Sequence, residues 1–138
     1  MLSLLKIDNI AIIESAEIEF SRGFNVLSGE TGAGKSIIID SIRLILGARA
    51  DKGLIRTGET EAYVSAVFSE VGEKFLKKLR HWDITPDEEG NIILSRTITV
   101  DGKNKVKING RVVPLGVLQE AGATDVCEVT FQQRESQG

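Results

Sequence analysis

The chain has 138 residues and a net charge of −3, from 17 lysines and arginines against 20 aspartates and glutamates. Its length suits one domain with its own core, and its charge excludes a chain that is attracted as a whole to nucleic acid or to an anionic membrane. The single cysteine, Cys127, excludes an internal disulfide, and the polar residues among the first 13 exclude a signal-peptide core or a membrane span there, so we expect a soluble protein of a reducing cytoplasm.

Three short apolar segments at the start of the chain are predicted to be strands. The first covers residues 2–7. In the second, residues 16–20, strict alternation places Ile18 and Phe20 on a buried face. The third, residues 24–27, leads into a glycine-rich stretch. Three strands before the first long helix differ from the simple alternation of strand and helix in doubly wound nucleotide-binding folds.

The glycine-rich stretch, residues 29–36, fits the phosphate-binding pattern G-x-x-x-x-G-K-S/T without a mismatch. Such a loop binds phosphate because its backbone N–H groups and the following helix N-terminus converge on the anion. The pattern predicts that Lys35 contacts the β and γ phosphates of a nucleotide and that the Ser36 hydroxyl coordinates Mg²⁺. The alternative is a glycine-rich turn that binds nothing. The predicted nucleotide-binding residues are Gly29, Glu30, Thr31, Gly32, Ala33, Gly34, Lys35, Ser36 and Ile37.

Residues 36–46 are predicted to form a helix whose apolar residues cover most of its circumference, which implies burial on most sides. Its narrow polar stripe includes Asp40 and Arg43, and a glycine ends it. In the region that follows, Arg49 and Arg56 are either contacts for phosphate or DNA or simply solvated loop arginines.

The middle of the chain is predicted to contain one strand and one basic helix. Residues 62–69 alternate, with mostly apolar residues on one side, as expected for a strand at a sheet margin. Residues 71–79 have apolar positions at helical spacing, and cationic residues surround them. This cationic face is either a nucleic-acid contact or a solvated surface. Its members are Lys74, Lys77, Lys78 and Arg80.

Two turn signals, Asp101-Gly102 and Asn109-Gly110, indicate a β meander in the last third of the chain. By the two-residue period of a strand, Lys103, Lys105 and Lys107 share one face. They are either a local contact for DNA or edge-strand lysines that discourage aggregation. The predicted strands are residues 91–100, 105–108 and 111–113, followed by a helix at 115–121 and a strand at 125–131.

A complete nucleotide hydrolase of this class also needs an acidic residue at the end of a second apolar strand, where it holds Mg²⁺ or positions the attacking water. The only run of several aliphatic residues that ends in an aspartate is 37–40, and Asp40 belongs to the predicted helix. Residues 104–107 depart from the guanine-reading pattern Asn-Lys-x-Asp at Lys107, which disfavours a GTPase. The sequence therefore predicts a phosphate site without the hydrolytic half.

Residues 4–12, 24–36, 46–51 and 101–111 together resemble the N-terminal head segment of the RecN family, bacterial ATPases of double-strand break repair that are related to the SMC and ABC families. The resemblance covers nearly all 138 residues. It implies an α/β fold: the N-terminal lobe of an ABC/SMC-type P-loop NTPase head, with a mixed sheet, an antiparallel β meander and few helices. Residues 1–138 are then one part of that head, and the coiled coil and the C-terminal head segment lie outside this chain.

The end of the chain carries a second part of the resemblance. Residues 133–137 partly match the Gln-His-Glu-His-Gln stretch of the family, with Arg134 and Ser136 in place of the histidines. The resemblance implies that Gln133 contacts Mg²⁺ and the attacking water, as a catalytic and metal-binding residue beside Lys35 and Ser36. The alternative for Gln133 is a frayed polar terminus.

The function implied by the resemblance is ATP binding by one half of an SMC-like head, with ATP-driven engagement of two heads in DNA double-strand break repair and recombination. The implied cofactors are ATP and Mg²⁺. The implied partners are the C-terminal head segment, a second head and DNA, with no membrane, in the bacterial cytoplasm at the nucleoid. We expect the chain alone to hydrolyse little ATP. The alternatives are a stand-alone ATP-sensing regulatory module without hydrolysis and a DNA-binding domain with a vestigial phosphate loop.

Overall fold

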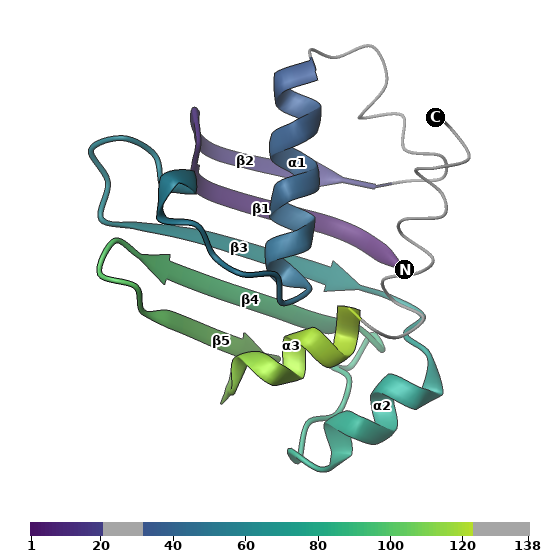
Figure 1. Ribbon diagram of the computed structural model, residues 1–138. Coiled ribbons are helices and arrows are strands. Elements are labelled where there is room, and N and C mark those ends of the chain that lie inside the picture. Colours follow the sequence, from purple (N-terminus) through teal and green to yellow (C-terminus); the bar gives the residue numbers. More distant parts are fainter. Residues whose placement is uncertain (21–31, 123–138) are drawn as a thin grey trace.

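The computed structural model describes residues 1–20 and 32–122 (Figure 1). Within these residues, strands form one sheet and helices pack against it. The elements in chain order are β1 (Leu2–Ile10), β2 (Ile13–Glu19), α1 (Gly32–Ile45), the short 3₁₀ helix η2 (Lys52–Leu54), β3 (Glu61–Phe68), α2 (Glu73–Arg80), β4 (Ile92–Thr99), β5 (Asn104–Ile108), β6 (Arg111–Val113) and α3 (Leu115–Gly122).

The predicted elements within the described residues are confirmed, with shifted boundaries. The first strand continues to Ile10, beyond its predicted end at residue 7. Helix α1 begins at Gly32, inside the glycine-rich motif, rather than at Ser36. Both predicted turns of the meander are present, and Gly102 and Gly110 adopt positive φ values of 87° and 83°. The strands predicted at residues 24–27 and 125–131 lie outside the described residues.

The sheet has the order β2-β1-β3-β4-β5-β6, and each described pair of neighbours is antiparallel. The prediction that the strand at residues 62–69 lies at a sheet margin is wrong. Strand β3 is central, because β1 pairs with one of its edges and β4 with the other. Its one-sided apolar pattern reflects burial of one face only, which a central antiparallel strand shows as readily as an edge strand.

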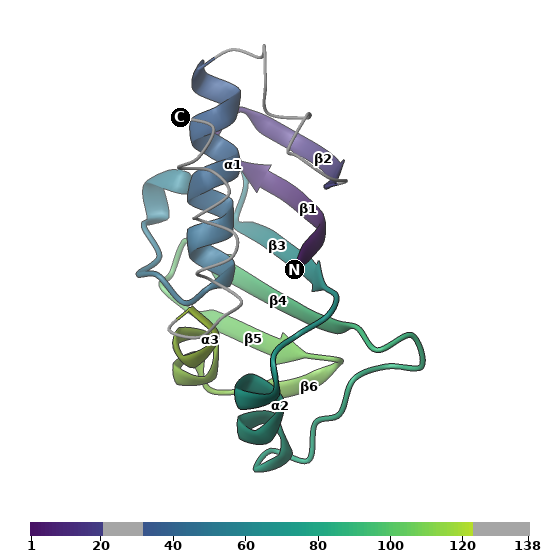
Figure 2. The same cartoon turned by 90° about the vertical axis from the view of Figure 1, so that its right-hand side faces the viewer.

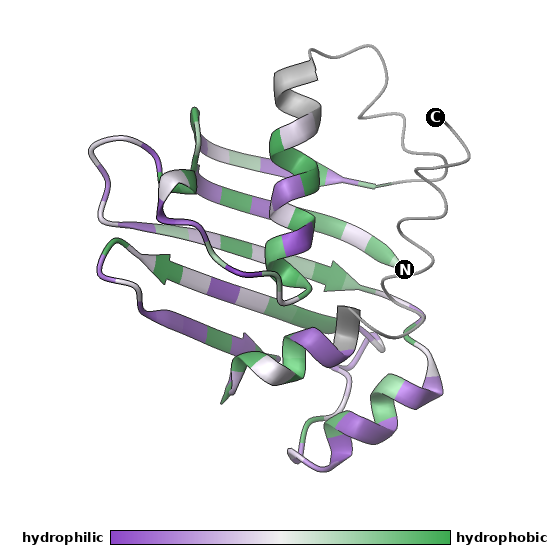
Figure 3. Cartoon of the chain, viewed as in Figure 1, coloured by the Kyte–Doolittle hydropathy of each residue, from purple (hydrophilic) through white to green (hydrophobic). Residues whose placement is uncertain are grey.

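The core lies between the sheet and α1. Helix α1 runs across the strands on one face, and α3 lies on the same face over β5 (Figures 1 and 2). Hydrophobic and hydrophilic residues alternate along the strands, as Figure 3 shows. On β3 the inward residues are at most 2% exposed: Ala62, Val64, Ala66 and Phe68. Burial of such apolar side chains supplies the main favourable free energy of folding.

Helix α1 is buried most completely in its carboxyl-terminal half. Ile42 and Ile45 are 1% and 0% exposed, whereas Ile37 and Ile38 are half-buried and Arg43 is exposed. The prediction of burial on most sides therefore describes the carboxyl-terminal half better than the amino-terminal half. The helix is fixed to the sheet mainly by its second half.

The opposite face of the sheet carries polar side chains. Cross-strand pairing aligns Glu17, Lys6, Ser65, Ser95 and Lys107 in one row, from β2 to β5. No described helix covers the middle of this face in Figure 2. Because an antiparallel sheet can bury one face and solvate the other, this arrangement is stable without a second layer.

Candidate functional site

The described part of the glycine-rich motif forms the start of α1. Gly32, Ala33, Gly34, Lys35 and Ser36 are the first five residues of this helix. The first four N–H groups of an α-helix have no partner within the helix, and the helix dipole adds positive potential there. No acidic residue lies in this first turn to compete for those groups. The backbone at this end of α1 is therefore suited to bind an anion.

The predicted site residues differ in where they lie. The backbone of residues 32–35 begins α1. Gly29, Glu30 and Thr31 lie outside the described residues, and so does Gln133. Ser36 is exposed, as a hydroxyl that binds a ligand must be. Ile37 is half-buried and packs against the core, so its side chain holds the helix start on the protein.

The residues present fit a magnesium ion that is bound together with phosphate. Among the described residues, no group of three or more His, Cys, Asp or Glu side chains is placed to hold a metal ion by itself. Mg²⁺ does not require such a cage, because it keeps several waters and commonly takes one or two protein ligands plus substrate phosphate oxygens. The exposed hydroxyl of Ser36 is a ligand of the kind that this mode of binding uses.

Helix α1 is supported inside its own structure by Ser41, a residue that the sequence analysis did not single out. Ser41 is completely buried, and its hydroxyl donates a hydrogen bond to the carbonyl oxygen of Ile37 at 2.8 Å. A buried hydroxyl without a partner is costly, so this bond makes the serine compatible with the core.

The carboxyl end of α1 is held by a buried arginine, which the sequence analysis also missed. Arg96 on β4 is 2% exposed, and its Nη1 donates to the carbonyl oxygens of Leu44 at 2.8 Å and Ala48 at 2.5 Å. A cation is favourable at a helix C-terminus, where carbonyl groups lack partners. Burial lowers the pKa of the Arg96 guanidinium below its usual value. The alternation of β4 contains the signal, since Arg96 occupies an inward position between Leu94 and Ile98.

Gly47 ends the same helix in a left-handed conformation, with φ of 95°. Gln119 of α3 lies against it: a Cβ atom at position 47 would lie 2.6 Å from Cγ and 2.7 Å from the backbone nitrogen of Gln119. The Gln119 side chain also donates from Nε2 to the carbonyl oxygen of Gly47 at 3.3 Å. The helix that begins in the motif therefore ends in contact with both β4 and α3.

The candidate basic contacts differ in their surroundings. Arg56 is half-buried, and its Nη1 lies 3.9 Å from Oε2 of Glu59. Arg49 is exposed and has no ion pair within the described residues. On α2, Lys74, Lys77 and Lys78 are exposed, as a solvated face requires.

Lys103, Lys105 and Lys107 line a groove of about 640 Å³ on the face of the sheet opposite α1, as the predicted shared face requires. Tyr63 and Thr97 lie in the same groove, which is open to solvent. This position of the lysines is compatible with both predicted interpretations, a contact for DNA and protection of the sheet against aggregation.

No helix within the described residues combines the length and apolarity that a membrane crossing would need.

Comparison with known families identifies one domain model across most of the chain. Residues 4–124 match the AAA domain family described as AAA_23. Among curated proteins, the chain is 44% identical over 123 residues to the DNA repair protein RecN of Halalkalibacterium halodurans, covering 88% of this chain and 22% of that protein. It is 43% identical over 122 residues to RecN of Vibrio cholerae, again covering 88% and 22%. The chain therefore spans about a fifth of the length of these relatives.

Solved structures with a similar fold include SMC head domains and the recombination mediator protein RecF. A structure from a study of ATP-driven dimerization and DNA-stimulated activation of SMC ATPases has a TM-score of 0.67 and 22% identity, covering 88% of this chain and 77% of that one. The SMC head domain of Thermotoga maritima has a TM-score of 0.60 and 23% identity, covering 86% and 41%. The recombination mediator protein RecF, in a structure described as RecF-ATPrS, has a TM-score of 0.59 and 20% identity, covering 86% of this chain and 29% of that one. At these identities the likeness concerns the fold.

Proposed function

The chain belongs to the AAA domain family, as an N-terminal segment of the RecN/SMC type of DNA repair and recombination ATPase, and from this premise we propose that it binds ATP with Mg²⁺ at residues 29–37. The observation that carries the proposal is the position of the motif. Its second half forms the first turn of α1, and α1 is anchored in the core by Ile42 and Ile45. A helix that is anchored in the core presents its first N–H groups to phosphate in one orientation.

The chemistry assigned to the chain is binding and charge stabilisation. Lys35 and the loop amides hold the phosphates, and Ser36 presents its hydroxyl to the metal ion. Bound Mg²⁺ supplies neutralisation of the charge that develops on the transferred phosphoryl group. Gln133 is proposed to orient the attacking water. These roles rest on the match of the motif and, for Gln133, on the family resemblance alone.

The proposed site is one half of a composite site. The acidic strand that completes hydrolysis is proposed to come from a C-terminal head segment outside residues 1–138, and a second head is proposed to close over the nucleotide. ATP then joins two heads and hydrolysis releases them, so the free energy of nucleotide binding drives a conformational change on DNA. We place this cycle in the bacterial cytoplasm at the nucleoid, in double-strand break repair and recombination.

Calorimetric titration of the chain with ATP and Mg²⁺ tests the proposal. We expect saturable binding that Lys35→Ala abolishes and that Lys74→Ala, an exposed lysine of α2, leaves unchanged. Equal binding by the chain and by Lys35→Ala would overturn the site. Salt-dependent DNA binding that ignores both ATP and Lys35→Ala would instead favour a DNA-binding domain with a vestigial loop.

An ATP hydrolysis assay distinguishes a half-site, which binds ATP without turning it over, from a complete enzyme. We expect negligible turnover by the chain alone. Robust magnesium-dependent hydrolysis that disappears in Lys35→Ala would contradict the half-site while keeping the ATP site. Magnesium-dependent ATP binding without turnover, even after a C-terminal head segment is supplied, would favour an ATP-sensing module.

A further inference from the structure

A cluster of cationic side chains lies at the carboxyl end of α1, around a cavity of about 240 Å³. The cavity is bounded by the loop after α1, the turn between β4 and β5 and the start of α3. Four cationic side chains line it, namely Arg49, Lys52, Arg96 and Lys103, together with Thr99 and Asn104. No carboxylate is among its lining residues within the described part of the chain.

Arg96 is the buried member of this cluster and lacks a negative partner. Its Nη1 donates to two main-chain carbonyl oxygens, and its Nε donates to Oδ1 of Asn104 at 2.9 Å. All these acceptors are neutral. The remaining nitrogen, Nη2, is buried and has no hydrogen-bond partner within the described residues. A buried guanidinium without a counter-charge or a full set of acceptors is unfavourable, which an anion beside it corrects.

Arg49 and Lys52 are two of the exposed members of the cluster. Both are free of ion pairs within the described residues, so binding of an anion breaks no existing pair. A Cβ atom on Gly102 would lie 3.9 Å from Cε of Lys52, which places the Lys52 stem beside the β4–β5 turn. Two long cationic side chains therefore border the cavity next to the buried guanidinium.

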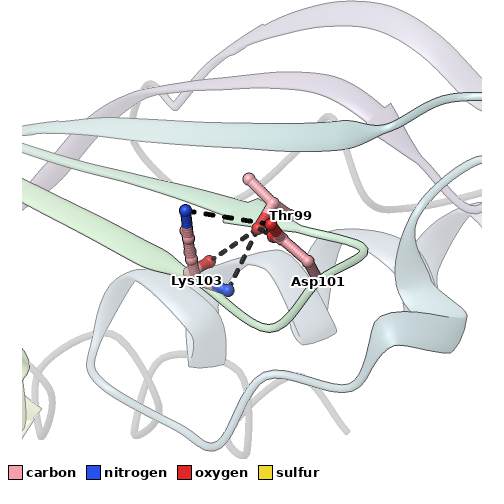
Figure 4. Close-up of polar contacts among 3 residues, drawn as sticks. All are labelled: Thr99, Asp101 and Lys103. Carbon is pink, nitrogen blue, oxygen red and sulfur yellow. Dashed lines mark hydrogen bonds and ion pairs between the residues drawn. The ribbon is translucent and has the colours of Figure 1, made fainter.

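The β4–β5 turn is ordered by its own side chains (Figure 4). The hydroxyl of Thr99 donates to the carboxylate of Asp101 and accepts from the backbone nitrogen of Lys103 at 3.0 Å. Nζ of Lys103 lies 3.9 Å from Oδ2 of Asp101, and both side chains are strongly exposed. Such an exposed pair is weak, so Lys103 remains available to an anion. The turn holds one wall of the cavity in place.

We propose that this cavity binds a phosphate group, at a site separate from the nucleotide motif. Phosphate offers several acceptor oxygens to the cations at the rim, Arg49, Lys52 and Lys103, and its negative charge compensates the buried guanidinium of Arg96 beside the cavity. Charge-assisted hydrogen bonds of this kind are the strong ones. The volume is below the range of roughly 300–1,000 Å³ for pockets that hold drug-sized ligands, which suits one phosphate group. About 20 Å of helix, at 1.5 Å per residue, separates this cavity from the first turn of α1.

The same chemistry is offered by a free phosphate compound and by a nucleic-acid backbone. Amide NMR spectra of the chain, titrated with inorganic phosphate at constant ionic strength, detect the shared binding. We expect saturable shifts at Gly102, Lys103 and Asn104, and at least a tenfold rise in Kd in the double variant Arg49→Gln/Lys52→Gln. The matched control Lys74→Gln/Lys77→Gln, on exposed positions of α2, leaves the Kd unchanged.

Two further arms complete the experiment. In Lys35→Ala, ATP binding disappears while the phosphate shifts at Gly102 persist, which separates this proposal from the proposed nucleotide site. A short DNA duplex that displaces phosphate from these amides identifies a nucleic-acid backbone as the source, whereas phosphate binding that DNA leaves intact identifies a free phosphate compound. Absence of saturable shifts at these three amides, or shifts that the double variant leaves unchanged, overturns the proposal.

Discussion

Arg96 Nη1 donates a hydrogen bond to the carbonyl oxygen of Leu44 at 2.8 Å, across 52 positions of the sequence. A side chain of β4 thereby caps the carboxyl end of α1, while the amino end of the same helix carries the phosphate-binding motif. The position of the motif on the sheet therefore depends on contacts at the opposite end of the helix.

Replacing this arginine tests the cap. Arg96→Met is expected to lower the free energy of unfolding by about 1–3 kcal/mol, because the carbonyl groups of Leu44 and Ala48 lose their donor at a buried site. Urea unfolding followed by circular dichroism measures it. The control is Arg43→Met, an exposed arginine of the same helix, with an expected change within about 0.5 kcal/mol. Equal effects of the two substitutions would contradict the cap.

Two glycine-to-alanine substitutions distinguish the effect of the contact between Gly47 and Gln119 from the effect of backbone strain. Gly47→Ala and Gly58→Ala both force an alanine to positive φ, at 95° and 91°, which costs roughly 1–2 kcal/mol. Only position 47 has atoms of another residue within 3 Å of the added Cβ, whereas position 58 has open space. Gly47→Ala is therefore expected to destabilise by about 1–3 kcal/mol more than Gly58→Ala in thermal unfolding.

A second change sharpens this result. Gln119→Ala in the Gly47→Ala background removes Cγ but leaves the close backbone nitrogen of Gln119 in place. We expect partial rescue. Full rescue, or equal costs at positions 47 and 58, would show that backbone contact with α3 does not limit this glycine.

Asn109 connects the last hairpin to two other segments. Its Oδ1 accepts from the backbone nitrogen of Ile93 at 2.6 Å, its Nδ2 donates to the carbonyl oxygen of Thr85 at 2.8 Å, and its φ is 48°. Asn109→Gly keeps the backbone conformation but loses both bonds, so about 1–3 kcal/mol is expected. Asn109→Ala adds backbone strain and is expected to cost more. Asn109→Asp keeps the acceptor and is expected to cost less than either, as measured by urea unfolding.

The proposed magnesium ligand Ser36 can be tested with Ser41, a serine of the same helix, as the control. Ser36 is exposed, so Ser36→Ala is expected to leave stability within about 0.5 kcal/mol while it removes most of the magnesium-dependent gain in ATP affinity. Ser41 is buried and bonded to the Ile37 carbonyl, so Ser41→Ala is expected to change stability and leave the magnesium dependence intact. Calorimetry with and without Mg²⁺ separates the two. An unchanged magnesium dependence in Ser36→Ala would contradict its proposed role.

Local patterns account for what the sequence predicts well. The strand at residues 62–69 and the meander alternate with a period of two, and Asn109-Gly110 is a strong turn signal, so these elements could be placed without knowledge of the fold. The nucleotide motif is likewise local, since one short stretch contains its pattern.

Long-range relationships account for what the sequence did not predict. The central place of β3 depends on which strands pair with it, and alternation alone does not specify its neighbours. Two of the acceptors of Arg96 are carbonyl groups at the carboxyl end of α1 and just after it, about 50 positions away. The neighbour of Gly47 is 72 positions away. The only sequence signal for the acceptors of Arg96 is its inward position on β4, where a charged side chain needs hydrogen-bond partners.

The fixation of α1 at its carboxyl end has a mechanical consequence. The Arg96 and Gln119 contacts lie about 20 Å along the helix from its first turn. A rotation of the helix by about 5° around these contacts displaces the first turn by roughly 1.7 Å, more than half the length of a hydrogen bond. The Arg96 and Gln119 contacts, together with the packing of Ile37, Ile42 and Ile45, therefore limit how far the first turn can move.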